Sequence, residues 1–327
     1  MSGINTAALF TLQEQDTEAA ALELFHYQYR ENDIYRAYTN ALRRKPSDIR
    51  SLLDIPFLPI QFFKTHTVTC GAFEPELIFE SSGTTQTINS RHLVKEAAIY
   101  EQSFLAGFER FYGPVSDYVV VGLLPSYLER KHSSLVYMVQ DMVKRSGHAA
   151  SGFYLYEHDK LAAHLRELEA SGQKTLLIGV TFGLLDFAEN YQLELNHTIV
   201  METGGMKGRR EEWTRQQVHA YLKERLGCKH IHAEYGMTEL LSQAYSYGDG
   251  IFTTPPWMKL LVRDESDPFE LSAANASGVI NVVDLANVHS CAFIATEDIG
   301  KIRPDGSFEV LGRLDNSALR GCSLMVS

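Results

Sequence analysis

The sequence predicts an α/β protein, and three observations lead to that class. Between residues 76 and 239 short apolar runs alternate with helical patterns, and strands that alternate with helices form parallel sheets. One run, residues 118–124 (YVVVGLL), is apolar throughout, as expected for a strand covered on both faces. After residue 250 the pattern changes to short β segments separated by turn residues. We therefore expect parallel-sheet α/β subdomains with a small β-rich subdomain.

The elements follow in order along the chain. Aromatic and aliphatic residues at helical spacing predict a helical N-terminal segment over 1–75, which includes an extended, proline-containing connector at 55–60. The α/β region is expected over 76–249, the β-rich subdomain over 250–316 and a tail over 317–327. Strands are predicted at 77–79, 118–124, 175–180, 198–201, 278–284 and 292–296, with a further pair flanking 304–306. Helices are predicted at 91–111, 134–145, 161–170, 184–190 and 211–226.

Composition excludes several classes of protein. The 327 residues carry 30 Lys and Arg against 41 Asp and Glu, a net charge of −11, and an acidic surface is a poor binder of nucleic acid. The four cysteines are scattered and form no CxxC pair, which suits a reducing compartment and argues against a metal knuckle. No apolar stretch has the length of a membrane span, and no secretory signal is visible. We expect a cytoplasmic protein without a membrane span.

A small-residue turn follows the first predicted strand of the α/β region. It consists of Ser81, Ser82, Gly83, Thr84 and Thr85. Hydroxyl side chains around a glycine allow backbone amides to approach a phosphate closely and add further donors. The segment is not a Walker A loop, because no GxxxxGK[ST] pattern occurs in the chain. A Ser/Thr-rich surface turn is the alternative interpretation.

A second motif stands at the end of a predicted strand and comprises Glu234, Tyr235, Gly236, Met237, Thr238 and Glu239. The tyrosine offers a flat face to a nucleobase, the threonine a hydroxyl to a phosphate, and the final glutamate a ligand for Mg²⁺. The alternative is a strand end with a packed tyrosine.

A third pair of segments lies in the β-rich region. Asp298 lies within the sequence Thr-Glu-Asp-Ile-Gly, and Arg313 within Gly-Arg-Leu-Asp. A carboxylate at a strand end can accept hydrogen bonds from both hydroxyls of a ribose. An ordinary β-turn aspartate is the alternative.

Together, the order and spacing of these segments resemble the adenylate-forming superfamily of acyl-CoA synthetases, luciferases and adenylation domains, over residues 76–321. Within it the chain is most similar to the acyl-protein synthetases, the long-chain-fatty-acid–luciferin-component ligase family. Residues 55–60, 79–85 and 124–130 and the ending Arg320-Gly321-Cys322 carry this likeness. The resemblance implies the N-terminal domain fold of adenylate-forming enzymes, with ATP and Mg²⁺ as cofactors. It also implies that a carboxylic acid, of fatty type, is activated as acyl-AMP and passed to a protein thiol.

The resemblance also implies roles for individual residues. Residues 81–85 would cradle the ATP phosphates, and the motif from Glu234 to Thr238 would bind the nucleotide. The remaining implied roles are adenine and acyl contacts for Gly204 and Gly205, adenine stacking for Tyr235, the α-phosphate for Thr238, Mg²⁺ for Glu239, ribose for Asp298, the hinge for Arg313 and acyl acceptance for Cys322.

Three departures from the family pattern leave alternatives open. Residues 86–89 (QTIN) replace the usual Gly-x-Pro-Lys, residues 317–319 (SAL) replace a hinge lysine, and we expect a form without the small C-terminal lid, as in the acyl-protein synthetases. One alternative function is an acyl-CoA ligase of the phenylacetate–CoA ligase type. Another is a non-catalytic protein that holds an acyl group or nucleotide for a partner. A protein that donates or accepts the acyl group is an expected partner.

Overall fold

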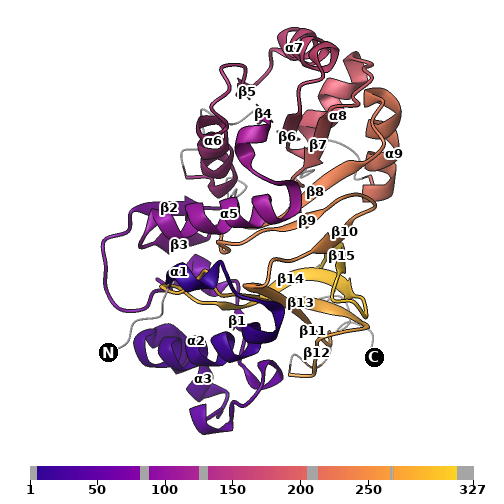
Figure 1. Ribbon diagram of the computed structural model, residues 1–327. Coiled ribbons are helices and arrows are strands. Elements are labelled where there is room, and N and C mark those ends of the chain that lie inside the picture. Colours follow the sequence, from indigo (N-terminus) through magenta and orange to yellow (C-terminus); the bar gives the residue numbers. More distant parts are fainter. Residues whose placement is uncertain are drawn as a thin grey trace.

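The computed structural model of the chain describes residues 6–81, 88–124, 132–204, 213–265, 267 and 269–314. Figure 1 shows helices α5 to α9 around strands β4 to β8, and helices α1 to α3 beside the strands of the β-rich region. The α-helices are α1 Thr6–Leu9, α2 Thr17–Glu31, α3 Asp33–Ala41, α4 Phe62–Thr65, α5 Ala97–Tyr112, α6 Ser134–Ser146, α7 His158–Ser171, α8 Thr181–Asn190 and α9 Arg215–Leu226. The strands are β1 Leu58–Pro59, β2 Leu77–Glu80, β3 Arg91–Val94, β4 Val119–Leu123, β5 Gly152–Tyr154, β6 Thr175–Gly179, β7 Thr198–Glu202, β8 Ile231–Tyr235, β9 Ala244–Ser246, β10 Ile251–Thr253, β11 Met258–Arg263, β12 Leu271–Ser272, β13 Ala276–Asp284, β14 Phe293–Ile302 and β15 Phe308–Arg313.

The predicted parallel sheet is present and is covered on both faces. Strands β5, β4, β6, β7 and β8 lie side by side and pair in parallel. Val119 and Val121 pack in one apolar core with residues of α7, α8 and α9, whereas Val120 packs in the other core with residues of α5 and α6. Because adjacent residues of a strand point to opposite faces, an all-apolar run such as β4 is stable only between two layers of helix.

The β-rich region continues the same sheet. The strand order is β12-β11-β13-β14-β15-β10-β9-β8-β7-β6-β4-β5, with β1 pairing to β14 in parallel. The direction changes at β9, which pairs antiparallel to β8, and the pairs from there to β12 are antiparallel as well. Thus the α/β fold class is confirmed, with one large mixed sheet joining both regions. The proposed domain bounds stay a prediction.

One predicted helix begins too early. Residues 91–94 form strand β3, which pairs with β2 in a separate two-stranded antiparallel sheet, and helix α5 begins only at Ala97. His92 and Val94 are buried while Arg91 is exposed, an alternation that belongs to a strand. The cross-strand ion pair between Arg91 Nε and Glu80 Oε1, at 3.4 Å, fits the same register.

The N-terminal helices pack on the β-rich region. Phe25 of α2 and Tyr35 of α3 lie against Phe293 of β14, the latter as a stacked pair with ring centroids 5.9 Å apart. Gln28 is fully buried and bonds to the backbone of the 287–292 turn. This helical segment is therefore part of the molecule's main core. Among the described residues, no helix combines the length and apolar composition that crossing a bilayer requires.

Candidate active site

Ser81, which begins the small-residue turn, and Ser90, which follows that turn, lie close to the second motif. The Ser81 amide donates to the Ser90 carbonyl (3.1 Å), and the Ser90 amide donates to Ser81 Oγ (2.9 Å). These two bonds hold Ser81 and Ser90 side by side. The Ser90 side chain in turn lies beside the carboxyl of Glu239 and lowers its pKa. The base of the turn and the end of the second motif therefore lie together.

Backbone hydrogen bonds fix the loop that carries Thr238 and Glu239. His92 of β3 donates from Nδ1 to the Thr238 carbonyl (2.9 Å), and Asn287 donates from Nδ2 to the Glu239 carbonyl (2.8 Å). Burial lowers the pKa of His92 to about 4, so the ring is neutral at pH 7 and its Nδ1–H can donate. Two segments distant in sequence thus hold the loop in one shape.

Asp284, at the end of β13, holds the residues that follow this loop. Its Oδ2 accepts from the amides of Leu241 (2.7 Å) and Ser242 (3.1 Å), and its Oδ1 accepts from the Ser242 hydroxyl and the Ala286 amide. Burial raises the pKa of Asp284, and these hydrogen bonds oppose the rise. Sequence reasoning missed Asp284, because its partners Leu241 and Ser242 lie more than 40 residues away in the sequence.

Glu239 is a buried carboxyl at the edge of this site. Glu239 is only 5% exposed. Burial raises the pKa of its carboxyl, and the neighbouring Ser90 side chain opposes this rise. A nearby cation stabilises the ionised form of such a buried carboxyl. Among the described residues, no group of three or more His, Cys, Asp and Glu could hold a metal ion. A Mg²⁺ bound by one carboxylate, substrate phosphates and water, which is its usual environment, fits this arrangement.

Tyr235, Asp298 and Arg313 form a connected group. The Tyr235 hydroxyl donates to Asp298 Oδ2 and Arg313 Nε donates to Oδ1, both at 2.9 Å. Asp298 and Arg313 lie opposite each other on β14 and β15, which brings together the two segments of the third pair. A carboxylate has about four lone-pair sites, so Asp298 keeps capacity for ribose hydroxyls.

Two glycines of the motifs lie close to neighbouring groups, and at Gly300 the neighbour is backbone. A Cβ at Gly236 would lie 2.4 Å from Glu234 Oε1, and one at Gly300 would lie 2.7 Å from the Glu309 carbonyl oxygen. Neither contact is tolerated by a real side chain without movement. The glycines of the second and third motifs therefore bring backbone and neighbouring groups together.

A buried charge cluster lies at the end of β7, beside Gly204. The Glu202 carboxylate accepts from the Gly204 amide (2.7 Å), the Thr181 hydroxyl (2.9 Å) and Arg215 Nε (3.2 Å). Burial raises the pKa of Glu202, but the nearby His219 (Nε2 to Oε1, 3.6 Å) and the three donors above outweigh it and hold the pKa at about 2. This carboxylate therefore shapes the backbone at Gly204, a role that sequence reasoning missed.

Glu234 has the opposite electrostatic character. Its side chain points from β8 to the face of the sheet opposite Tyr235, toward Tyr100 and Tyr245. Burial, and secondarily the charge of Glu202, raise its pKa to about 8. The carboxyl is therefore largely protonated at pH 7 and can donate a hydrogen bond.

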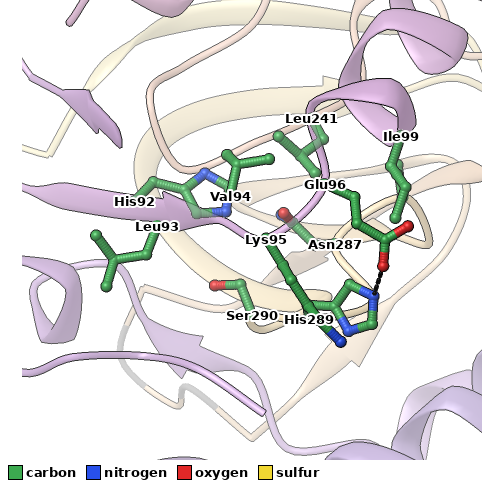
Figure 2. A pocket seen from close by; sticks show the side chains of 11 residues that line it. His92, Leu93, Val94, Lys95, Glu96, Ile99, Leu241, Asn287, His289 and Ser290 are labelled. Atoms are coloured by element: carbon green, nitrogen blue, oxygen red, sulfur yellow. Dashed lines mark hydrogen bonds and ion pairs between the residues drawn. The ribbon is translucent and has the colours of Figure 1, made fainter. Parts of the chain in front are cut away.

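A small hollow beside β3 does not provide room for a substrate. Figure 2 shows it between His92 and Glu96 on one side and Asn287 and His289 on the other, with His289 Nε2 bonded to Glu96 (3.2 Å). Its volume is about 10 Å³, the space of one water molecule.

The predicted site residues divide into two groups. Ser81, Gly204, the motif Glu234 to Glu239, Asp298 and Arg313 are described, and the contacts above bring them to the loops and strand ends around β8 and β14. The predicted residues Ser82, Gly83, Thr84, Thr85, Gly205 and Cys322 lie outside the described residues. The roles of both groups stay predictions.

Comparisons with known proteins find two ligases whose sequences are similar to this chain. The chain is 23% identical, over an alignment of 350 residues, to the long-chain-fatty-acid–luciferin-component ligase of Vibrio harveyi, covering 99% of this chain and 91% of that protein. It is 21% identical to the ligase of the same name from Aliivibrio fischeri, covering 97% and 89%. No protein-family model matches the chain.

The fold is similar to solved structures of adenylate-forming ligases. The structure of 2-hydroxyisobutyryl-CoA ligase in complex with 2-HIB-AMP and CoA superposes with a TM-score of 0.66 at 12% identity, covering 95% of this chain and 71% of the ligase. ATP-bound MatB from Rhodopseudomonas palustris superposes with a TM-score of 0.54 at 20% identity, covering 74% and 49%. The chain thus spans about half the length of MatB.

The protein has the fold of the N-terminal domain of adenylate-forming ligases. In sequence it is distantly homologous, at 23% identity over nearly the whole chain, to the long-chain-fatty-acid–luciferin-component ligases, the acyl-protein synthetases.

Proposed function

We propose that the protein activates a carboxylic acid, of fatty type, as acyl-AMP at the expense of ATP and passes the acyl group to a protein thiol. The observation that supports the proposal is the approach of Glu239 to Ser90, which is hydrogen-bonded to Ser81 at the start of the predicted phosphate-binding segment. Distant homology to the acyl-protein synthetases over nearly the whole chain supports the same activity.

The first step needs charge neutralisation and alignment more than covalent chemistry. A substrate carboxylate attacks the α-phosphorus, the bond to pyrophosphate breaks, and acyl-AMP forms. Glu239 would bind the Mg²⁺ of ATP, Thr238 would contact the α-phosphate, and Asp298 would bind ribose. Groups fixed before the reaction lower its barrier because they need no reorganisation.

In the second step a thiolate attacks the acyl carbonyl, and AMP leaves. The three described cysteines, Cys70, Cys228 and Cys291, are buried. Burial raises their pKa values, to about 11 for Cys228 and about 12 for Cys291. Since the thiolate is the nucleophile, none of these three is suited to accept an acyl group. Cys322 is therefore our candidate acceptor.

A pair of measurements tests the two steps. ATP–pyrophosphate exchange over a panel of fatty and aromatic acids detects adenylation, and intact-mass analysis after incubation with ATP, Mg²⁺ and the best acid detects an adduct. We expect exchange and one hydroxylamine-labile acyl group per chain. Exchange followed by acyl-CoA formation would indicate a CoA ligase, and absence of exchange with every acid would indicate a binding protein.

Substitution of Cys322 separates the acceptor from the adenylation site. Cys322→Ser should lose the adduct and keep pyrophosphate exchange, whereas Cys228→Ser, the matched control, should keep both. An adduct that persists in Cys322→Ser would show that another group carries the acyl chain.

A further inference from the structure

A second cavity lies between the helical N-terminal segment and the β-rich strands. Its volume is about 210 Å³, and it is lined by the end of α3, the 53–61 connector and residues of β11, β12, β13 and β14. None of the residues lining it belongs to the candidate active site. A function assigned to this cavity is therefore separate from the proposed adenylation.

Arg263, one of the residues lining the cavity, is held firmly and keeps donor capacity. Its Nη1 donates to the Ile280 carbonyl and to Asn281 Oδ1, and its Nη2 donates to the Thr296 carbonyl. A guanidinium has five N–H donors, so these contacts with described residues leave two for a ligand. A fixed guanidinium with free N–H groups is suited to a carboxylate.

Two arginine side chains bring positive charge to the cavity, although the whole chain is acidic. Arg44 and Arg263 line it, and Asp54 is the carboxylate among the described residues that line it. Asp54 already accepts from the Arg50 amide (3.1 Å), the Ser51 amide (2.9 Å) and the Ser51 hydroxyl (3.0 Å). Glu297, which is near Arg263, accepts a hydrogen bond from Gln61 Nε2. Both acidic groups have protein partners of their own.

The remaining walls are apolar. Phe57, Leu271 and Ala295 line the interior, and Leu53 and Phe269, which also line the cavity, are 47% and 54% exposed. Exposed large apolar residues beside a cavity are typical of a binding site. An apolar cavity of about 150 Å³ takes up benzene, so this one has room for a ring or short chain of roughly eight or nine non-hydrogen atoms.

We propose that this cavity binds a small organic carboxylate, with the carboxylate on Arg263 and the apolar body between Phe57 and Leu271. It is an accessory acid site, distinct from the site where the acid is activated. Thr296 lies between this cavity and the candidate active site. Its carbonyl accepts from Arg263, and its hydroxyl accepts from the Asp298 amide (3.1 Å).

Photolabelling locates the ligand directly. The full chain, without ATP, is irradiated with a diazirine-substituted benzoate, and labelled peptides are mapped by mass spectrometry. We expect labels in peptides spanning residues 38–61 and 263–296, with competition by benzoate and none by benzyl alcohol or benzylamine. Labels confined to other peptides, or equal competition by all three compounds, would overturn the proposal.

Charge reversal at the cavity supplies the matched comparison. Arg44→Glu changes the charge at the cavity by two units, which at about 6 Å in water corresponds to a roughly tenfold loss of benzoate affinity. Arg50→Glu makes the same change at an exposed residue outside the cavity lining and should leave the affinity unchanged. Ala295→Leu, checked for an unaltered circular dichroism spectrum, fills part of the cavity and should abolish labelling. If the Arg44 and Arg50 variants behave alike, or if Ala295→Leu is labelled as well as the wild type, the proposal is wrong.

Discussion

At the scale of single residues, Tyr235 contributes a hydroxyl as well as a ring to the candidate site. The hydroxyl bonds to Asp298, while the ring meets Phe252 and Phe308 edge to face. We expect Tyr235→Phe to lower the free energy of unfolding by about 0.5–1.5 kcal/mol, the contribution of one hydrogen bond, and to weaken ATP binding by no more than this amount, because the lost bond acts on ATP only by positioning Asp298. Tyr235→Ala, which also removes a stacking surface, should weaken ATP binding by about 1–3 kcal/mol. Isothermal titration calorimetry measures ATP binding, and urea denaturation measures the free energy of unfolding.

Tyr247→Phe is the control for this pair, because Tyr247 is exposed and bonds only to the Phe111 carbonyl in the contacts described. It should bind ATP as the wild type does. Wild-type affinity in both Tyr235 variants would remove this residue from the nucleotide site.

Glu234 gives the stability of the protein a pH dependence of known sign. Its pKa is raised to about 8 in the folded state, against about 4.3 in an unfolded chain. Between these values the unfolded state releases the proton first, so the wild type loses stability as pH rises, by up to about 1.4 kcal/mol per pH unit. The glutamine of Glu234→Gln cannot titrate. The melting temperature of the variant minus that of the wild type should therefore increase from pH 5 to pH 8. Thermal melts at several pH values measure the difference.

The exposed Glu224 serves as the reference. Glu224→Gln should show the same melting difference from the wild type at every pH. A Glu234→Gln difference that is equally flat would mean that the Glu234 carboxyl is ionised in the folded protein at neutral pH.

At the scale of elements, the end of β13 holds the loop that follows β8 and carries Glu239. The Asp284 carboxylate accepts from two amides in the segment after Glu239. Asp284→Asn would place an NH₂ group against these donors, and leaving buried donors unpaired costs about 1–3 kcal/mol each. We expect a lower free energy of unfolding and slower pyrophosphate exchange. Urea denaturation and the exchange assay measure the two effects.

Asp48→Asn is the control, because Asp48 is an exposed residue of the N-terminal segment and does not hold the loop that carries Glu239. Asp48→Asn should leave both quantities unchanged. Normal exchange in a destabilised Asp284→Asn would show that the loop keeps its shape without this carboxylate.

At the scale of the whole molecule, the sequence predicts best what depends on local pattern. Strands β4, β6 and β7 and helices α6 and α9 follow from apolar runs, caps and helical spacing, and they are present. Strand β3 was missed because Val94 continues the helical spacing of α5, and only pairing with β2 reveals the strand. Asp284, His92 and Asn287 could not be predicted as supports of the motif loop, because each contacts it across 40 or more residues.

The N-terminal helices, which carry none of the three motifs, are coupled to the candidate site through Gln28. Its Nε2 donates to the carbonyls of Asn287 (2.7 Å) and Val288 (3.1 Å), and its Oε1 accepts from the Ala292 amide (2.9 Å). Asn287 in turn donates to the Glu239 carbonyl. A change in α2 can therefore reach the loop that carries Glu239 through a single turn.

Gln28→Leu tests this connection, since it removes three buried hydrogen bonds at nearly constant volume. Buried groups left without partners cost about 1–3 kcal/mol each, so the melting temperature should fall by several degrees, and ATP affinity should fall with it. Gln15→Leu, at an exposed residue of the same segment, should change neither. Differential scanning calorimetry and ATP titration below the melting range separate the effects. A lower melting temperature with unchanged ATP affinity would mean that the 287–292 turn holds Glu239 without help from α2. The N-terminal segment would then stabilise the fold and have no effect on ATP binding.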